Sequence, residues 1–201
     1  MAFSPQPPLF LTGNRHKLAE FQQVWPELQS WDIDLPEIQH HDARAVVRAK
    51  LLSAAQLKPG CSLMVEDTAL CLSALGGLPG PLTKWFVDPQ ALGIQGLAEL
   101  ALQRQDPQAE ALTLIGLLHV AETPDGSIAQ NAESLHIFEG RTAGQVVLPR
   151  GTQGFGWDPI FQPEGSALTF AEMDRAEKAR YSMRQRALDR VSAFLQSLSQ
   201  G

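Results

Sequence analysis

The sequence has little cysteine, no long apolar run and no excess of basic residues. Its two cysteines, Cys61 and Cys71, are too few for a secreted disulfide scaffold, and we expect two reduced core thiols rather than a bridge. No stretch stays apolar for the roughly 18 residues that a membrane-spanning helix needs, and residues 1–11 do not resemble a signal peptide. These absences favour a cytoplasmic protein with no membrane partner.

Positive charge is not in excess either, because 16 Lys and Arg residues face 22 Asp and Glu residues, a formal net charge of -6. This balance argues against broad nucleic-acid binding, which needs a basic surface. The five histidines show no metal-ligand spacing, no Cys/His cluster suggests zinc, and no Gly-x-Ser-x-Gly elbow suggests a serine hydrolase. A small anionic ligand in a local basic pocket stays compatible with the composition.

What the sequence does contain is enough apolar residues, 44%, for a core within its 201 residues. No repeat or linker divides the chain, so we treat residues 1–201 as a single domain. Strands and helices mix, with consecutive strands in the middle, which predicts an α/β or α+β fold with a mixed sheet. We expect strands at 9–11, 63–65, 112–120, 135–138 and 145–148, and irregular loops at 76–81 and 151–159 with a turn at 124–126. We expect helices at 15–24, at 42–56 with Asp42 as the N-cap, at 94–103 and toward 198.

The first candidate for chemistry is the turn Thr12-Gly13-Asn14 between a short strand and a helix. A helix N-terminus presents free backbone N–H groups and a partial positive charge, which suit a phosphate. Gly13 would let a phosphate approach the backbone, Thr12 and Asn14 would add donors, and Lys17 lies one turn into the helix. A plain tight turn with an Asn cap explains the segment equally well.

The second candidate is the carboxylate pair Glu66-Asp67, which we place at the end of the strand 63–65. Neighbouring residues on a strand point to opposite faces, so at most one of the two enters a given site. Hard oxygen ligands of this kind suit Mg²⁺ beside a polyphosphate. Two solvated carboxylates at a strand end are the simpler alternative.

Two further segments could contact a nucleoside. In the loop 154–159 an aromatic residue could stack on a base, and Asp158 could accept from a base N–H. At the head of the C-terminal helix, Lys178 and Ser182 lie four residues apart on one face, and Arg184 follows half a turn later. A structural aromatic loop and a solvated basic helix remain open as alternatives.

Taken in order, these segments resemble the inosine triphosphate pyrophosphatase family, which hydrolyses deaminated and other non-standard purine nucleoside triphosphates. Five matching blocks in family order span most of the chain, so the probability that they agree by chance is very small. The blocks are TGNRHKL at 12–18, LPEIQ at 35–39, VEDTALCLSALGGLPGPLTKWF at 65–86, RGTQGFGWDPIFQP at 150–163 and TFAEMDRAEKARYSMRQRAL at 169–188.

The resemblance implies a long mixed β-sheet flanked by helices, with two lobes around an active-site cleft, and a homodimer. It implies release of a monophosphate and pyrophosphate from ITP, dITP or XTP with Mg²⁺ as cofactor. Glu37 and Asp67 would bind the metal, and Asp67 would also activate water. The implied substrate contacts are Thr12, Gly13, Asn14, Arg15, His16, Lys17, Lys50, Thr68, Lys84, Phe155, Gly156, Trp157, Asp158, Lys178, Ser182, Met183 and Arg184.

One residue departs from the family pattern. The family has Ser-His-Arg where this chain has Ser182-Met183-Arg184. A methionine cannot make a strong hydrogen bond, so either base selection differs or Met183 packs in the apolar stripe of the last helix. This leaves an altered base preference and a non-catalytic nucleotide-binding protein as alternatives, although the retained carboxylates and lysines speak against the latter.

Overall fold

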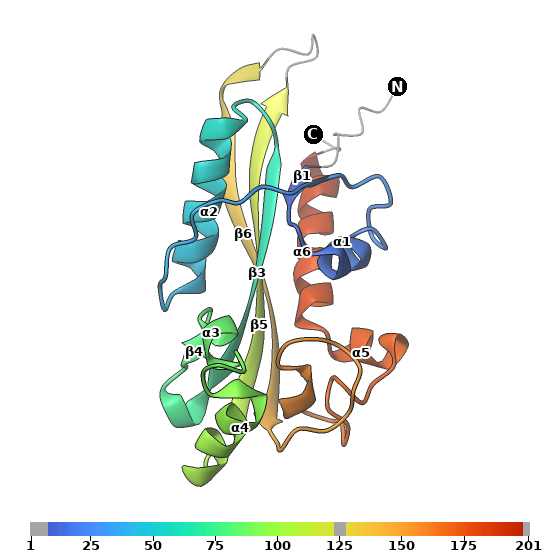
Figure 1. Ribbon diagram of the computed structural model, residues 1–201. Helices are drawn as coiled ribbons and strands as arrows, with labels where there is room; N and C mark the ends of the chain where they lie inside the picture. The colour runs from blue at the N-terminus through green and yellow to red at the C-terminus, as the bar shows by residue number, and fades with distance from the viewer. Residues whose placement is uncertain (1–7, 123–127, 199–201) are drawn as a thin grey trace.

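The computed structural model describes residues 8–122 and 128–198, and it contains one mixed sheet of seven strands (Figure 1). The first strand runs parallel to the second and third, and the other pairings are antiparallel. The strands are β1 (Leu9–Leu11), β2 (Ser30–Trp31), β3 (Leu63–Leu72), β4 (Pro79–Gly80), β5 (Gln108–Glu122), β6 (Ile128–Val146) and β7 (Phe161–Pro163). Their order is β2-β1-β3-β5-β6-β7, with β4 beside β3.

Helices lie on both faces of this sheet, which confirms the predicted fold class. They are α1 (Arg15–Phe21), α2 (Ala43–Leu57), α3 (Thr83–Phe86), α4 (Gly93–Gln103), α5 (Arg175–Tyr181) and α6 (Met183–Leu198), with short 3-10 turns η1 (Ser73–Leu75) and η2 (Asp158–Ile160). In Figure 1, α2 covers one face of β3 and β5, whereas α6 lies on the other side with α1.

Short polar side chains begin three of the helices. Asn14 Oδ1 accepts hydrogen bonds from the backbone N–H groups of His16 and Lys17 at the start of α1. Asp42 accepts from the N–H of Arg44 at the start of α2, as predicted, and an Asp residue caps α5 in the same way. Each cap satisfies backbone donors that a helix leaves unpaired at its N-terminus, typically worth about 1 kcal/mol.

The core consists of three apolar clusters, two of them on opposite faces of the sheet. Val47 and Leu51 of α2 pack on one face of the sheet, and Phe10 packs with Leu188 of α6 on the other face. The third cluster lies at the far end of the long strands, around Phe161. The chain thus buries both faces, which explains why the central strands are apolar on both sides.

Several predicted boundaries are wrong. The strand predicted at 63–65 continues to residue 72, so Glu66 and Asp67 lie within β3 rather than at its end. The strands predicted at 135–138 and 145–148 belong mainly to one long strand, β6, because β5 pairs with it along most of its length. The C-terminal helix is broken at Ser182, which separates α5 from α6. The turn predicted at 124–126 lies outside the described residues.

The cysteine expectation is half right. Both thiols are free, as expected, but Cys61 is exposed and only Cys71 is partly buried. No helix among the described residues is long and apolar enough to cross a membrane.

One edge of β3 is left open in the middle of the strand. β1 pairs with β3 only at Leu63 and Met64, and β4 pairs with it only at Leu70 and Cys71. Between these points, residues 65–69 have a partner strand, β5, on one side only within the described part of the chain. This stretch contains Glu66 and Asp67, so both carboxylates lie beside an interruption in the sheet.

Candidate active site

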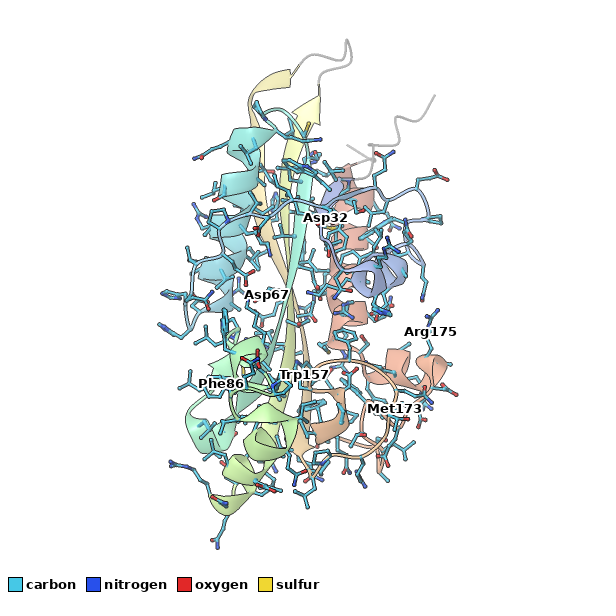
Figure 2. All side chains as sticks on the ribbon, in the orientation of Figure 1. Asp32, Asp67, Phe86, Trp157, Met173 and Arg175 are labelled. Carbon is cyan, nitrogen blue, oxygen red and sulfur yellow. The ribbon has the colours of Figure 1, made fainter. Side chains whose placement is uncertain are left out.

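A cleft of about 340 Å³ reaches the open edge of β3 at Thr68, whereas Lys17, Glu37 and Asp67 do not belong to its lining. Its walls come from α1, from the loop before η2, and from α5 and α6. Figure 2 shows Asp67 near the middle of the sheet, and Arg175 on the side of α5. The cleft is lined by His16, Glu20, Thr68, Phe155, Lys178 and Arg184, among others.

The turn that follows β1 forms a preorganised helix start. Thr12 Oγ1 accepts from the N–H of Asn14 at 3.1 Å, and Asn14 Oδ1 caps α1. The Thr12 hydroxyl hydrogen and the Asn14 NH₂ group remain available as donors. A side chain at Gly13 would place its Cβ 2.5 Å from Asp32 Oδ1, so a larger residue there would require the exposed Asp32 side chain to move. The Asn cap that the sequence offered as the simpler explanation is therefore present, and phosphate binding at the same turn stays a prediction.

Glu66 occupies the centre of the site, fully buried between two cations. Its Oε2 lies 2.7 Å from Lys17 Nζ, and its Oε1 accepts from Arg184 Nε at 2.9 Å. Burial alone would raise the pKa of Glu66, but Arg184 and Lys17 outweigh this and lower it to about 2. The carboxylate therefore stays ionised, and it neutralises two side chains that we predicted to bind the substrate.

Asp67 has a different environment from Glu66, as expected for adjacent strand residues. Burial raises the pKa of Asp67 to about 6, with nearby Lys17 opposing this and the charges of Glu66 and Glu37 adding to it. Its Oδ2 is buried and has no hydrogen-bond partner among residues 8–122 and 128–198. An aspartate held in this way is ionised at neutral pH but keeps an affinity for protons, as a general base requires.

Two more predicted residues gather around Glu37, in the segment before α2. The carboxylate of Glu37 lies 3.3 Å from Lys50 Nζ and 3.5 Å from Lys84 Nζ. Burial opposes ionisation, but the two lysines hold the pKa of Glu37 below its ordinary value. Glu37 is near enough to Asp67 for its charge to affect that residue's pKa. The structure thus groups both predicted metal ligands with both lysines.

The residues present fit a magnesium ion at this point. Asp67 Oδ2 is an unsatisfied buried acceptor, and Glu37 supplies a second ionised carboxylate nearby. Mg²⁺ is commonly held by one or two carboxylates together with substrate phosphates and water. Within residues 8–122 and 128–198, no group of three or more His, Cys, Asp or Glu side chains could hold a metal ion by itself.

The cleft itself is aromatic and cationic, since Phe155, Lys178 and Arg184 all line it. Phe155 is partly exposed, with Lys178 Nζ 5.5 Å and Arg184 Cζ 5.8 Å from its ring centroid, and His16 stacks at 6.5 Å. Arg184 Nη1 donates to Glu20 at 2.5 Å, whereas its buried Nη2 has no hydrogen-bond partner in the described part of the chain. A flat ring beside an unpaired donor can take a purine base that carries a carbonyl group.

The loop residues before η2 differ in role, and some of them hold the residues around Phe155 in place instead of presenting a side chain to a base. Asp158 is buried, and its Oδ2 accepts from Lys178 Nζ at 2.6 Å and from the N–H of Phe155 at 2.9 Å. Trp157 is buried against the rings of Phe161 and Phe170, so its main role is packing. The prediction that the loop presents an aromatic ring therefore applies to Phe155.

Only some of the remaining predicted residues line the cleft. Thr68, Ser182 and Met183 line the cleft, but the Met183 side chain is 5% exposed and lies in the apolar cluster around Phe161. Arg15 is exposed and does not line the cleft, and Gly156 lies in an open turn with positive φ.

Sequence reasoning missed Glu20, which fixes Arg184. Its one signal was a spacing of three residues from Lys17, which puts both on one face of α1. Gln153, Met173 and Arg175 also line the cleft, and no pattern in the sequence marked them.

Solved structures share this fold. A HAM1 protein from Coxiella burnetii superposes with a TM-score of 0.75 at 27% identity, covering 94% of this chain and 99% of that chain. The Staphylococcus aureus Ham1 protein gives a TM-score of 0.75 at 22% identity, covering 95% of this chain and 99% of that one.

Sequence comparison gives nearer relatives. The chain is 42% identical over 188 residues to an inosine triphosphate pyrophosphatase of Fusarium vanettenii, covering 92% of this chain and 94% of the relative. It is 41% identical over 197 residues to an inosine triphosphate pyrophosphatase of Mycosarcoma maydis, covering 94% and 95%. The sequence model of the Ham1 family matches residues 9–194. The chain therefore belongs to the Ham1 family.

Proposed function

We propose that this protein hydrolyses deaminated purine nucleoside triphosphates, such as ITP, dITP and XTP, to the monophosphate and pyrophosphate. The observation that carries the proposal is the division of the site at the open edge of β3. Lys17 and Lys50 lie with two acidic residues at one end, and Arg184 lies beside the Phe155 ring at the other. The curated relatives named inosine triphosphate pyrophosphatase support the same reaction.

Base selection follows from the free donor of Arg184. Its Nη2 would donate to O6 of inosine or xanthine, with the ring held against Phe155. The amino group of adenine would instead place a donor against a donor, which costs binding free energy. The site would thereby remove deaminated nucleotides before polymerases use them.

The chemical step requires water to attack the α-phosphorus. Asp67 would accept a proton from this water as the new P–O bond forms and the bond to the bridging oxygen breaks. Lys17, Lys50, Lys84 and the N-terminus of α1 would offset the charge that develops on the pyrophosphate. Mg²⁺ bound by Glu37 and Asp67 would neutralise phosphate charge and favour ionisation of water.

The decisive experiment is a substrate profile with identified products. We expect pyrophosphate, not orthophosphate, and faster hydrolysis of ITP and XTP than of ATP and GTP in the presence of Mg²⁺. If ITP and XTP are no faster, the alternative with altered base selection is correct. Nucleotide binding with no turnover at alkaline pH with Mg²⁺ would identify a non-catalytic binding protein.

We also propose a cytoplasmic homodimer, as the family resemblance implies. Light scattering coupled to size exclusion would give a mass near twice 21.9 kDa. A mass of one chain at micromolar concentration would contradict this.

A further inference from the structure

One carboxylate, Glu66, contacts a cation at each end of the site. We propose that Glu66 is a positioning residue that fixes Lys17, at the phosphate end, and Arg184, at the base end, at one separation. The hold on the triphosphate and the choice of base would then depend on a single side chain. This inference rests on the proposed function and deepens it, because it names the residue that couples the two ends.

The burial of these three side chains makes the coupling rigid. The Glu66 side chain is fully buried, and those of Arg184 and Lys17 are 5% and 18% exposed. Water therefore competes little for either contact, and removing one partner would leave an uncompensated charge in the interior. Exposed ion pairs, in contrast, rearrange at little cost.

The geometry of Arg184 shows what the contact with Glu66 controls. A guanidinium group is planar, so contacts at two of its nitrogens fix the direction of the third. Glu66 holds Nε and Glu20 holds Nη1, which leaves the direction of Nη2 determined by these two carboxylates.

Lys17 depends on Glu66 in another way. Its flexible stem extends from the first turn of α1, and Glu66 provides its one ion pair within the described residues. Two of its three ammonium hydrogens remain free for phosphate oxygens. Glu66 thus holds the ammonium group in place without using all its donors.

Glu66→Gln tests the coupling, because an amide oxygen can replace one half of the carboxylate only. The amide NH₂ would face the second cation, donor against donor. Binding is measured by calorimetry in EDTA, so that no turnover occurs, with tripolyphosphate for the phosphate end. The ratio of affinities for ITP and ATP reports the base end. We expect the affinity for tripolyphosphate and the ratio of ITP to ATP affinity each to fall by about tenfold or more.

Glu20→Gln is the matched control, since Glu20 contacts Arg184 but not Lys17. It should lower the ratio of ITP to ATP affinity and leave tripolyphosphate binding unchanged. If Glu66→Gln changes only one of the two readouts, the coupling is refuted.

Glu66→Asp keeps the charge and shortens the reach by one methylene, so it replaces Glu66→Gln if circular dichroism shows that the latter is unfolded. Its expected and contradicting outcomes are the same. Since both readouts are binding constants, they decide the coupling even if the wild type releases no pyrophosphate and the proposed function fails.

Discussion

At the scale of single residues, Asp67 carries a charge where burial disfavours it. Its pKa is raised from 3.8 to about 6, so between these values the folded protein binds a proton that the unfolded chain has lost. The free energy of unfolding therefore falls as pH rises from about 4 to 6, and above this the charge costs on the order of 2–3 kcal/mol. The proposed general base is thus a source of instability at neutral pH.

We predict that Asp67→Asn abolishes turnover and stabilises the protein by about 1–3 kcal/mol at pH 7.5, since it removes the buried charge. Urea unfolding at pH 4 to 8 would show the gain growing from about pH 4 to 6 and staying constant above that. The control is Asp34→Asn at an exposed position. Equal stability of Asp67→Asn and wild type at pH 7.5, or unchanged turnover, would contradict this account.

Met183 gives a second prediction at this scale. Because its side chain is buried in an apolar cluster, Met183→His should destabilise the protein by about 1–3 kcal/mol at pH 7.5. Met183→Leu, of similar volume, should cost less than about 1.5 kcal/mol. The ITP-to-ATP ratio of kcat/KM decides its functional role: a sharper preference in Met183→His means that the position contacts the base, and no change means that Met183 only packs.

The sequence predicted the members of the site better than their partners. Lys17, Glu37, Lys50 and Asp67 do gather at one end, and all but Lys50 lie in the matching sequence blocks. The sequence did not predict that Glu66 joins Lys17 to Arg184, since that contact spans 118 positions along the chain.

At the scale of elements, the start of α6 lies directly against β6. A Cβ atom at Gly140 would collide with the backbone carbonyl of Met183 and with the N–H of Ala187. Backbone atoms cannot move aside as a flexible side chain can, so glycine is required for this contact. The contact also sets the position of Arg184, the next residue along α6.

We therefore predict that Gly140→Ala costs about 1–3 kcal/mol in unfolding free energy and lowers kcat/KM for ITP, because α6 must shift. Thermal unfolding and initial rates check this. Gly96→Ala in α4 is the control: its Cβ would make ordinary contact with Leu92, and alanine favours helix by about 1 kcal/mol. Equal effects of the two substitutions would show that α6 does not depend on Gly140.

Element boundaries were predicted where local signals exist. The Asp42 cap gave the start of α2, and helical periodicity gave α4 within one residue. The length of β6 depends on its pairing with β5. The break at Ser182 depends on packing against β6, where Thr142 donates to the carbonyl of Tyr181 at 2.5 Å. Local propensity carries no information about such contacts.

At the scale of the whole molecule, we expect the fold not to depend on the proposed metal. Glu37 is compensated by Lys50 and Lys84, and both faces of the sheet carry apolar clusters of their own. The ion would instead join the site with the substrate's phosphates, because two carboxylates leave most of its coordination sphere to other oxygens. Metal binding and nucleotide binding should then be linked, while folding is independent of the metal.

We predict that EDTA abolishes turnover and leaves the Tm of the free protein unchanged within about 1 °C, since no folding free energy comes from the metal. Mg²⁺ alone should raise the Tm little, and Mg²⁺ with tripolyphosphate should raise it more than the two separate effects combined, because each ligand completes the other's site. Glu37→Gln is the matched variant: it removes one metal ligand and should abolish the excess shift. A large fall in Tm with EDTA alone would mean that the ion holds the fold together, and strictly additive shifts would mean that metal and phosphates bind at separate places.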